Sequence, residues 1–206
     1  MANIDSVTLE VADPSTARSF YDAAFGLGED RLDLRAGETP STGFRGFHIS
    51  LVADQPGDVH ALFDAAVAAG AAVLKPMAKS MWGHGGVVQA PDGTIWKMAT
   101  SAKKDTRPAE RRFDEIVLLV GADDVSASKK FYVGHGLAVG KSFGSYVDFK
   151  MGSSPIGFGL YKRAALAKDA GVPPEGTGSH RLTVGGDVGE FTDPDGFAWE
   201  SVRVHP

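Results

Sequence analysis

The chain has 206 residues, of which 43% are hydrophobic and 23% are charged, a balance typical of a globular protein with a buried core. It contains no cysteine, which excludes disulfides, thiolate zinc sites and a cysteine nucleophile. A net charge of −5 argues against nucleic acid as a partner. No apolar run approaches the roughly 18 residues that a membrane span requires, and no signal-peptide pattern is visible, so we expect a cytoplasmic protein.

The first half of the chain alternates strand and helix signals. The segment Ser6–Val11 is rich in β-branched and aliphatic residues, which predicts a strand. Asp13 and Pro14 are typical of a helix start, and Gly26 of a helix end. Further strands are expected over residues 31–35, 47–52, 86–89 and 95–99, with a turn at 91–93, and a second helix is expected from 56 to 70.

A polar, charged segment at 103–112 contains Pro108 and has no hydrophobic period, which is typical of a linker. It predicts one module over 1–102 and a second over 113–206. The second module shows strands at 115–120, 145–151, 156–162 and 181–184, with helices at 125–132 and 164–171. The second helix of the first module has no counterpart here, so we expect the two halves to share one core.

An internal repeat relates the two halves. The segment VTLEVADPSTARSFYDAAFGL (7–27) parallels IVLLVGADDVSASKKFYVGHGL (116–137), and APDGTIWKMA (90–99) parallels DPDGFAWESV (193–202). Trp96 and Trp199 occupy equivalent places after the two Pro-Asp-Gly turns. Since neighbours on a strand alternate faces, we expect both tryptophans in the core and the residues after them, Lys97 and Glu200, on the opposite face.

This ordered and duplicated set of motifs resembles the vicinal-oxygen-chelate superfamily, the group of glyoxalases, bleomycin-resistance proteins and extradiol dioxygenases. The resemblance covers nearly the whole chain and is closest to two-module, glyoxalase-like proteins. It implies an α+β fold in which two tandem βαβββ-like modules form a mixed, cup-shaped, curved sheet with helices outside. It also implies that chemistry occurs on the floor of the cup.

The resemblance implies metal-ligand positions at Ser6, Lys97, Glu115 and Glu200, where metal-dependent relatives carry His, Gln or Glu. Ser6 is a poor ligand, and a protonated lysine repels a cation. We therefore expect no resident metal cofactor, although Glu115 and Glu200 could hold Mg²⁺ or Mn²⁺ weakly. The expected arrangement is an ion pair between Lys97 and Glu200 that lines a concave pocket, and a bare internal salt bridge is the structural alternative.

Three other side chains are candidates for contact with a ligand. His48 alternates with Phe47 and Ile49 on a predicted strand and could face the cup. His84 lies in the glycine-rich stretch Gly83–Gly86, which lacks the order of a phosphate-binding loop and is typical of a bend or bulge. Trp82 precedes that stretch and is free to line a pocket.

The leading functional hypothesis is a protein that binds a small organic molecule, similar to bleomycin-resistance proteins and without the usual metal-ligand set. The alternative is a metal-dependent lyase or isomerase of glyoxalase type that uses Glu115 and Glu200. The expected partner is a small organic molecule rather than nucleic acid or membrane, and the chain is expected to be a monomer or a homodimer.

Overall fold

The computed structural model describes residues 2–29 and 31–201, which form four helices and fifteen strands in three sheets. The helices are α1 (Pro14–Phe25), α2 (Pro56–Ala68), α3 (Val125–Gly134) and α4 (Arg163–Ala170). The strands of the first half are β1 (Ile4–Val11), β2 (Leu32–Ala36), β3 (Ser41–Gly43), β4 (Phe47–Val52), β5 (Ala72–Ser80), β6 (Gly83–Gln89) and β7 (Ile95–Thr100). Those of the second half are β8 (Glu115–Ala122), β9 (Ala138–Phe143), β10 (Tyr146–Lys150), β11 (Ile156–Lys162), β12 (Gly176–Gly178), β13 (Leu182–Gly186), β14 (Phe191–Thr192) and β15 (Ala198–Ser201).

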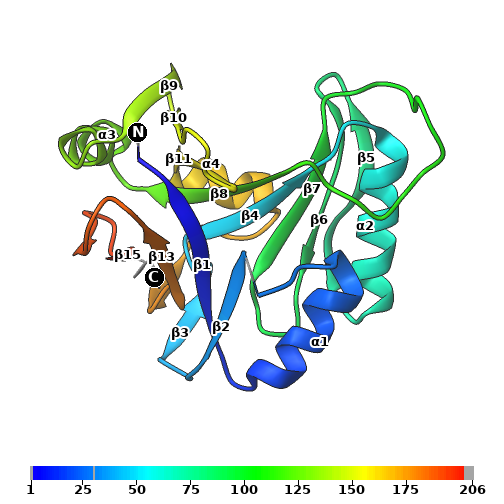
Figure 1. The fold of residues 1–206 in the computed structure, drawn as a ribbon, viewed down its shortest axis with the longest axis horizontal. Coiled ribbons are helices and arrows are strands. Elements are labelled where there is room, and N and C mark those ends of the chain that lie inside the picture. The colour runs from blue at the N-terminus through cyan, green and yellow to red at the C-terminus, as the bar shows by residue number, and fades with distance from the viewer. Residues whose placement is uncertain (1, 30, 202–206) are drawn as a thin grey trace.

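An eight-stranded sheet in the order β5-β6-β7-β4-β8-β11-β10-β9 is the largest element of the fold. Two complete βαβββ units build it, β4-α2-β5-β6-β7 and β8-α3-β9-β10-β11. In each unit the first strand pairs in parallel with the last, and the two units join by antiparallel pairing of β4 with β8. Figure 1 shows the sheet bending from β5 on one side to β9 on the other.

A five-stranded sheet in the order β14-β15-β13-β1-β2 combines the two ends of the chain. Here β1 is antiparallel to β13, and a small ladder of β3 with β12 adds a further link between the halves. The expected α+β class and cup-shaped sheets are confirmed. The complete βαβββ units, however, are shorter than the predicted modules, because each half holds one complete unit and one reduced unit. The limits 1–102 and 113–206 stay a prediction.

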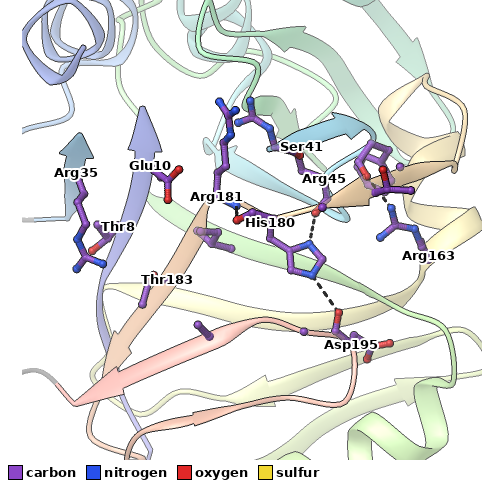
Figure 2. A pocket seen from close by; sticks show the side chains of 18 of the residues that line it. Thr8, Glu10, Arg35, Ser41, Arg45, Arg163, His180, Arg181, Thr183 and Asp195 are labelled. Carbon is purple, nitrogen blue, oxygen red and sulfur yellow. Dashed lines mark hydrogen bonds between the residues drawn. The ribbon is translucent and has the colours of Figure 1, made fainter. Parts of the chain in front are cut away.

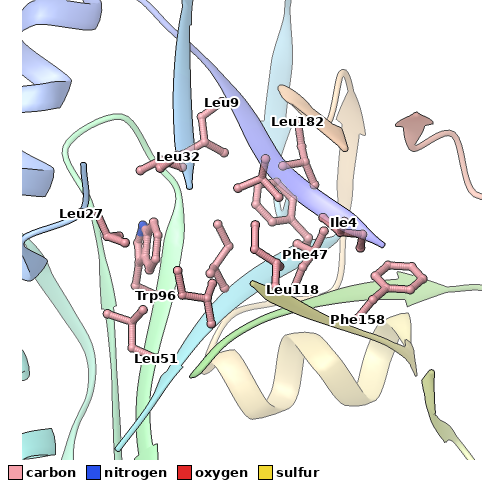
Figure 3. Packing of buried hydrophobic residues seen from close by; sticks show 14 of the residues in the cluster. Ile4, Leu9, Leu27, Leu32, Phe47, Leu51, Trp96, Leu118, Phe158 and Leu182 are labelled. Atoms are coloured by element: carbon pink, nitrogen blue, oxygen red, sulfur yellow. The ribbon is translucent and has the colours of Figure 1, made fainter. Parts of the chain in front are cut away.

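The hydrophobic core lies between the two sheets and beneath α1, α2 and α3. Leu9 and Leu182 from the five-stranded sheet meet Phe47, Leu118 and other side chains from the eight-stranded sheet (Figure 3). Because both sheets bury their apolar faces against each other, their opposite faces are left for polar side chains and cavities.

Two equivalent hydrogen bonds fix the outer helices to the turns of the repeat. The hydroxyl of Tyr21 on α1 donates to Asp92 at 2.6 Å, and that of Tyr132 on α3 donates to Asp193 at 2.5 Å. Each tyrosine also packs beside a buried tryptophan, at ring-centroid distances of 5.4 Å for Trp96 and 5.6 Å for Trp199. The predicted core position of both tryptophans is confirmed.

Helix α4 departs from the expected arrangement of helices outside the cup. Its buried residues Leu166, Ala167 and Ala170 pack against Val87 and Ile95 of the eight-stranded sheet, on the face opposite the main core. In Figure 1 the helix accordingly lies between the β9–β11 strands and the β5–β7 strands. The reason is that α4 follows β11 directly and carries its own apolar stripe, which the concave face of the sheet buries.

The linker is held against α2 by a buried carboxylate rather than left in solvent. Asp58 is fully buried and accepts hydrogen bonds from Arg107, from Gln55 and from the backbone N–H of Glu110. Burial alone would raise the pKa of Asp58, but these donors outweigh it and hold the pKa below its usual range. Its contribution to stability is therefore complete above pH about 4 and is lost as the pH falls further.

No helix among the described residues is long and apolar enough to cross a membrane.

We predict that Asp58→Ala lowers the free energy of unfolding by about 3 kcal/mol at neutral pH, because it removes the acceptor of Arg107, of the Gln55 amide and of the backbone N–H of Glu110. The matched control is Asp64→Ala, on the exposed face of the same helix, which should change stability by no more than about 0.5 kcal/mol. Urea denaturation followed by circular dichroism measures both. Equal effects of the two substitutions would show that the hydrogen bonds to Asp58 contribute nothing to the free energy of unfolding.

Candidate functional site

The structure distributes the predicted site residues over two sheets. His48, Lys97 and Glu115 lie on β4, β7 and β8 of the eight-stranded sheet, on the face away from the main core. Ser6 and Glu200 lie on β1 and β15 of the five-stranded sheet, again facing away from the core. Because the shared core separates these two faces, the seven predicted residues do not form one site.

The predicted ion pair between Lys97 and Glu200 is wrong. The ammonium group of Lys97 donates to both carboxylate oxygens of Asp169 on α4, at 2.9 and 2.7 Å. Glu200 instead accepts from Arg35 on β2, at 3.4 Å to each oxygen. The repeat places the two residues at equivalent positions, but those positions belong to different sheets, so their side chains do not converge.

A cavity of about 630 Å³ lies over the eight-stranded sheet, and we call it the lysine cavity. Three of the predicted residues line it together: Lys97 on its floor, and Trp82 and His84 from the β5–β6 hairpin. The rest of its wall is mainly apolar and comes from β4, β5, β6 and β7, with Asp169 from α4 closing one side. The sequence analysis therefore found part of this cavity and predicted the helix at 164–171, but it did not predict that this helix closes the cavity.

A compact polar cluster of His48, Lys97 and Asp169 adjoins the lysine cavity, and of these three residues Lys97 and Asp169 line it. His48 is fully buried, and its Nε2 lies 3.3 Å from Oδ2 of Asp169 without the geometry of a good hydrogen bond. Burial lowers the pKa of His48, an effect that Asp169 opposes only in part. Partial burial would raise the pKa of Asp169, but His48 and Lys97 outweigh it and hold that pKa well below its usual range. At neutral pH the cluster is therefore a neutral imidazole beside a lysine–aspartate ion pair.

Lys75 on β5 adds a second positive charge to the same cavity. Its ammonium group donates to the backbone carbonyls of Lys168 and Asp169 at 2.6 and 2.7 Å. These carbonyls belong to the last turn of α4, where the helix dipole favours a cation. Lys75 thereby fixes the end of α4 that carries Asp169, and it also leaves the lining with two lysines against one aspartate.

The β5–β6 hairpin forms the mouth of the lysine cavity. Trp82 has 81% of its surface exposed, and the neighbouring Met81 has 79%. The Nε2 atom of His84 is buried and has no hydrogen-bond partner in the part of the chain that the structure describes. The predicted bend or bulge at Gly83–Gly86 is not what the pairing shows, because this stretch forms the start of β6 and pairs with β7 without a register shift. The two irregularities of the β5–β6 pairing place their extra residues on β5, between Val73 and Ala78. A Cβ at Gly86 would lie 2.8 Å from the ring of Phe63, so the close approach of α2 requires glycine there.

A second cavity, of about 530 Å³, lies on the outer face of the five-stranded sheet (Figure 2). We call it the arginine cavity because Arg35, Arg45, Arg163 and Arg181 all line it. The predicted residue Glu200 lies beside it as the partner of Arg35, whereas Ser6 does not line it. Nothing in the sequence pattern pointed to this cavity, because its arginines come from four separate segments.

The residues at the positions implied for a metal do not fit a divalent cation. The cross-strand neighbours of Lys97 are Ser50 on β4, Val87 on β6 and Val117 beyond Ser50 on β8, which offer one hydroxyl. The one carboxylate in contact with Lys97, that of Asp169, is paired with its ammonium group, and His48 adds a single imidazole beside it. Glu115 and Glu200 lie on different sheets and cannot share one ion. Within residues 2–29 and 31–201, no group of three or more His, Asp or Glu side chains is arranged to hold a metal.

Comparisons with known proteins agree with this architecture. Residues 23–98 match the family model of the glyoxalase/bleomycin resistance protein/dioxygenase superfamily. The chain is similar in structure to glyoxalase I from Zea mays, with a TM-score of 0.64 and 16% identity over 98% of this chain and 92% of that one. It is also similar to a putative dioxygenase from Bacillus subtilis, with a TM-score of 0.54 and 12% identity over 94% and 71% of the two chains. A search of curated protein sequences finds no match. At these identities the solved structures establish the fold alone.

We predict that His48 makes the protein less stable in acid. The pKa of His48 is lowered in the folded state, so below pH about 6.5 the imidazole binds a proton in the unfolded chain and stays neutral in the folded chain. The free energy of unfolding should therefore fall by up to about 1.4 kcal/mol per pH unit from this group as the pH drops below that value. In His48→Gln this part of the slope should vanish, while His60→Gln, at an exposed position on α2, should retain it. Chemical denaturation between pH 8 and pH 5 provides the measurement, and identical slopes in the two variants would contradict the prediction.

We also predict that Lys97 is energetically coupled to Asp169 and not to Glu200. A double-mutant cycle with Lys97→Met and Asp169→Asn should give a coupling of about 1 kcal/mol, since both side chains are only partly exposed. The parallel cycle with Lys97→Met and Glu200→Gln should be additive within about 0.5 kcal/mol. Comparable coupling in both cycles would show that the two sheets communicate through charge.

Proposed function

We propose, on the premise that this chain belongs to the glyoxalase/bleomycin resistance protein/dioxygenase superfamily, that it binds a small organic anion with an apolar body in the lysine cavity. The proposal includes binding without a tightly held transition metal, because the donor set described above does not suit one. A cytoplasmic location and a monomeric or homodimeric state are parts of the same proposal.

The observation that carries this proposal is the hydrogen bonding of Lys97. A lysine ammonium group has three N–H donors, and Asp169 accepts two of them. The third has no protein acceptor among the described residues, although Lys97 is partly buried and faces the cavity. A donor held in this way binds an oxygen of a ligand without having to break the existing ion pair.

The charge of the lining selects the sign of the ligand. Lys75 and Lys97 together outweigh Asp169 by one positive charge. A ligand with a single carboxylate would neutralise that excess, whereas a cation would be repelled by both lysines. The fit is therefore best for a monoanion, and a neutral carbonyl compound that accepts one hydrogen bond is the next best.

The wall of the cavity selects the body of the ligand. Pro76, Val87 and Ala99 present apolar surface, and the exposed indole of Trp82 stands at the mouth. Most small-molecule sites combine such a wall with one or two polar anchors. A ring or short hydrocarbon that covers Trp82 would remove apolar surface from water at about 25 cal/mol for each Å².

We predict a fixed order of binding for three ring compounds of similar size and different charge. Benzoate should bind most tightly, benzyl alcohol more weakly and benzylammonium weakest, with roughly millimolar affinity for the best of them because the probes are small. Binding should change the fluorescence of Trp82, since Trp96 and Trp199 are buried in the core. The Trp82→Phe variant identifies that signal by losing it.

The variants that test the site are Lys97→Met and the matched control Lys79→Met. Lys79 is an exposed lysine on β5, in the hairpin at the mouth of the cavity, and its side chain does not line the cavity. We expect Lys97→Met to abolish the preference for benzoate over benzyl alcohol and Lys79→Met to leave it intact. The proposal fails if the three probes bind equally, or if both variants reduce benzoate binding to the same extent.

A further inference from the structure

The arginine cavity contains positive charge that the protein does not neutralise by direct contact. Arg45, Arg163 and Arg181 are each partly buried there. Within residues 2–29 and 31–201, their hydrogen bonds go to backbone carbonyls, and none forms a salt bridge with a carboxylate. Elsewhere in the fold, partly buried cations such as Lys97 and Arg107 do have a carboxylate partner.

Backbone acceptors hold these arginines in fixed positions. Arg45 donates to the carbonyl of Asp92 at 2.7 Å, and Arg181 donates to that of Thr39 at 2.8 Å. Arg163 donates to the carbonyls of Phe44 and Pro174 at 2.6 and 3.1 Å. Each guanidinium group has five N–H donors, so most donors remain available for a ligand.

Two glycines provide space for the guanidinium groups. A Cβ at Gly93 would lie 2.8 Å from Nη2 of Arg45, and one at Gly46 would lie 2.6 Å from Nη1 of Arg163. Both glycines also have positive φ angles, of 88° and 85°. The turns around them are therefore shaped to accommodate the arginine side chains.

Arg181 has an unusual backbone conformation. Its φ of 52° is the only positive value among the non-glycine residues that the structure describes. This left-handed conformation costs of order 1 kcal/mol for a residue with a side chain. It occurs directly before β13, where it sets the direction in which the side chain leaves the strand. Local strain at a cavity wall is a common mark of a ligand site.

Two of the three acidic side chains of the lining, those of Glu10 and Asp195 but not Asp123, are already engaged by other donors. Glu10 accepts from the backbone and the hydroxyl of Thr39, and Asp195 accepts from the backbone of Asp123 and from Ser128. Burial, followed by the like charge of Arg181, lowers the pKa of Arg45. That repulsion between neighbouring cations is relieved when an anion binds between them.

We propose that the arginine cavity is a second binding site, independent of the lysine cavity, for a small anion that presents several phosphate or carboxylate oxygens. Arginine forks suit such groups because each can bind two oxygens at once. Figure 2 shows Arg35 and Arg163 at the two ends of the lining, with Arg181 and His180 between them. The hydroxyl groups of Thr8, Ser41 and Thr183 add neutral donors along the same wall. The two cavities thus differ in the ligands they accept: the lysine cavity suits one carboxylate on an apolar body, and the arginine cavity suits a polar group with several oxygens.

Isothermal titration with inorganic phosphate and with citrate, at constant ionic strength, tests the proposal. Saturable binding of at least one anion, with one site per chain, is the expected result. A preference for phosphate identifies phosphate esters as the ligand class, and a preference for citrate identifies polycarboxylates. Absence of saturable binding for both anions overturns the proposal.

Four variants locate the site. Arg181→Met should weaken binding at least tenfold, and Arg35→Met should weaken it severalfold. Arg35 is exposed, and its side-chain hydrogen bonds among the described residues are the two long ones to Glu200, so its loss should leave the fold intact. This variant keeps the test valid if Arg181→Met does not fold. Two control variants should leave anion binding unchanged. Arg112→Met removes an arginine that pairs with Asp114 and lines neither cavity, and Lys97→Met changes the lysine cavity alone. Equal weakening in all four variants would indicate general attraction to positive charge and would overturn the assignment.

Discussion

Antiparallel pairing of β4 with β8 is the contact on which both cavities depend. It runs in unbroken register from Phe47 opposite Val120 to Val52 opposite Glu115. A shift of one residue would exchange the two faces of β4 and move His48 and Ser50 into the core. The hydrogen bonds of Asp58 to the linker act on the same junction of β4 with β8, because the linker leads directly into β8. Holding the linker therefore helps to hold the register that places the charged residues on the cavity side.

Helix α4 determines how much of the concave face of the eight-stranded sheet is open to a ligand. An open concave face would present Lys97 and His48 to solvent or to whatever ligand entered. Here the chain supplies its own anion, Asp169, and its own apolar cover, so that only part of the concave face remains as a cavity. The ligand is thus left with a partly satisfied lysine and an apolar wall, which favours modest, charge-selective binding over strong electrostatic capture.

Local patterns in the sequence predicted much of the fold. Asp13 caps α1 and Gly26 ends it in a left-handed conformation, as expected, and the limits of β4 and β11 were predicted correctly. Strands β5 and β9 were not predicted, because β5 contains Lys75, Pro76 and Lys79 and both strands lie at sheet edges where alternation is weak. The sequence also indicated correctly that the second half has no counterpart of α2 before its last strand, since no helix lies between β13 and β15.

The site was harder to predict than the fold, for a physical reason. Periodicity shows on which face of a strand a residue lies, and it placed Lys97 and Glu200 away from the core correctly. It does not show which strands become neighbours, and that information decided their partners. Asp169 comes from a helix distant in sequence from Lys97, and Arg45 and Arg181 come from segments without a motif. Such partners are fixed by tertiary packing alone.

The twin bonds from Tyr21 to Asp92 and from Tyr132 to Asp193 have a consequence for how a duplicated protein diversifies. Each bond fixes the core-facing side of its turn, and each copy has a buried tryptophan beside that bond, Trp96 or Trp199. The residue after the tryptophan points away from the core, and it is positively charged in one copy (Lys97) and negatively charged in the other (Glu200). Strand alternation thereby separates what must be retained from what is free to change, residue by residue. One ancestral unit could in this way acquire two unlike chemical preferences within a single chain, while the scaffold beneath them stayed the same.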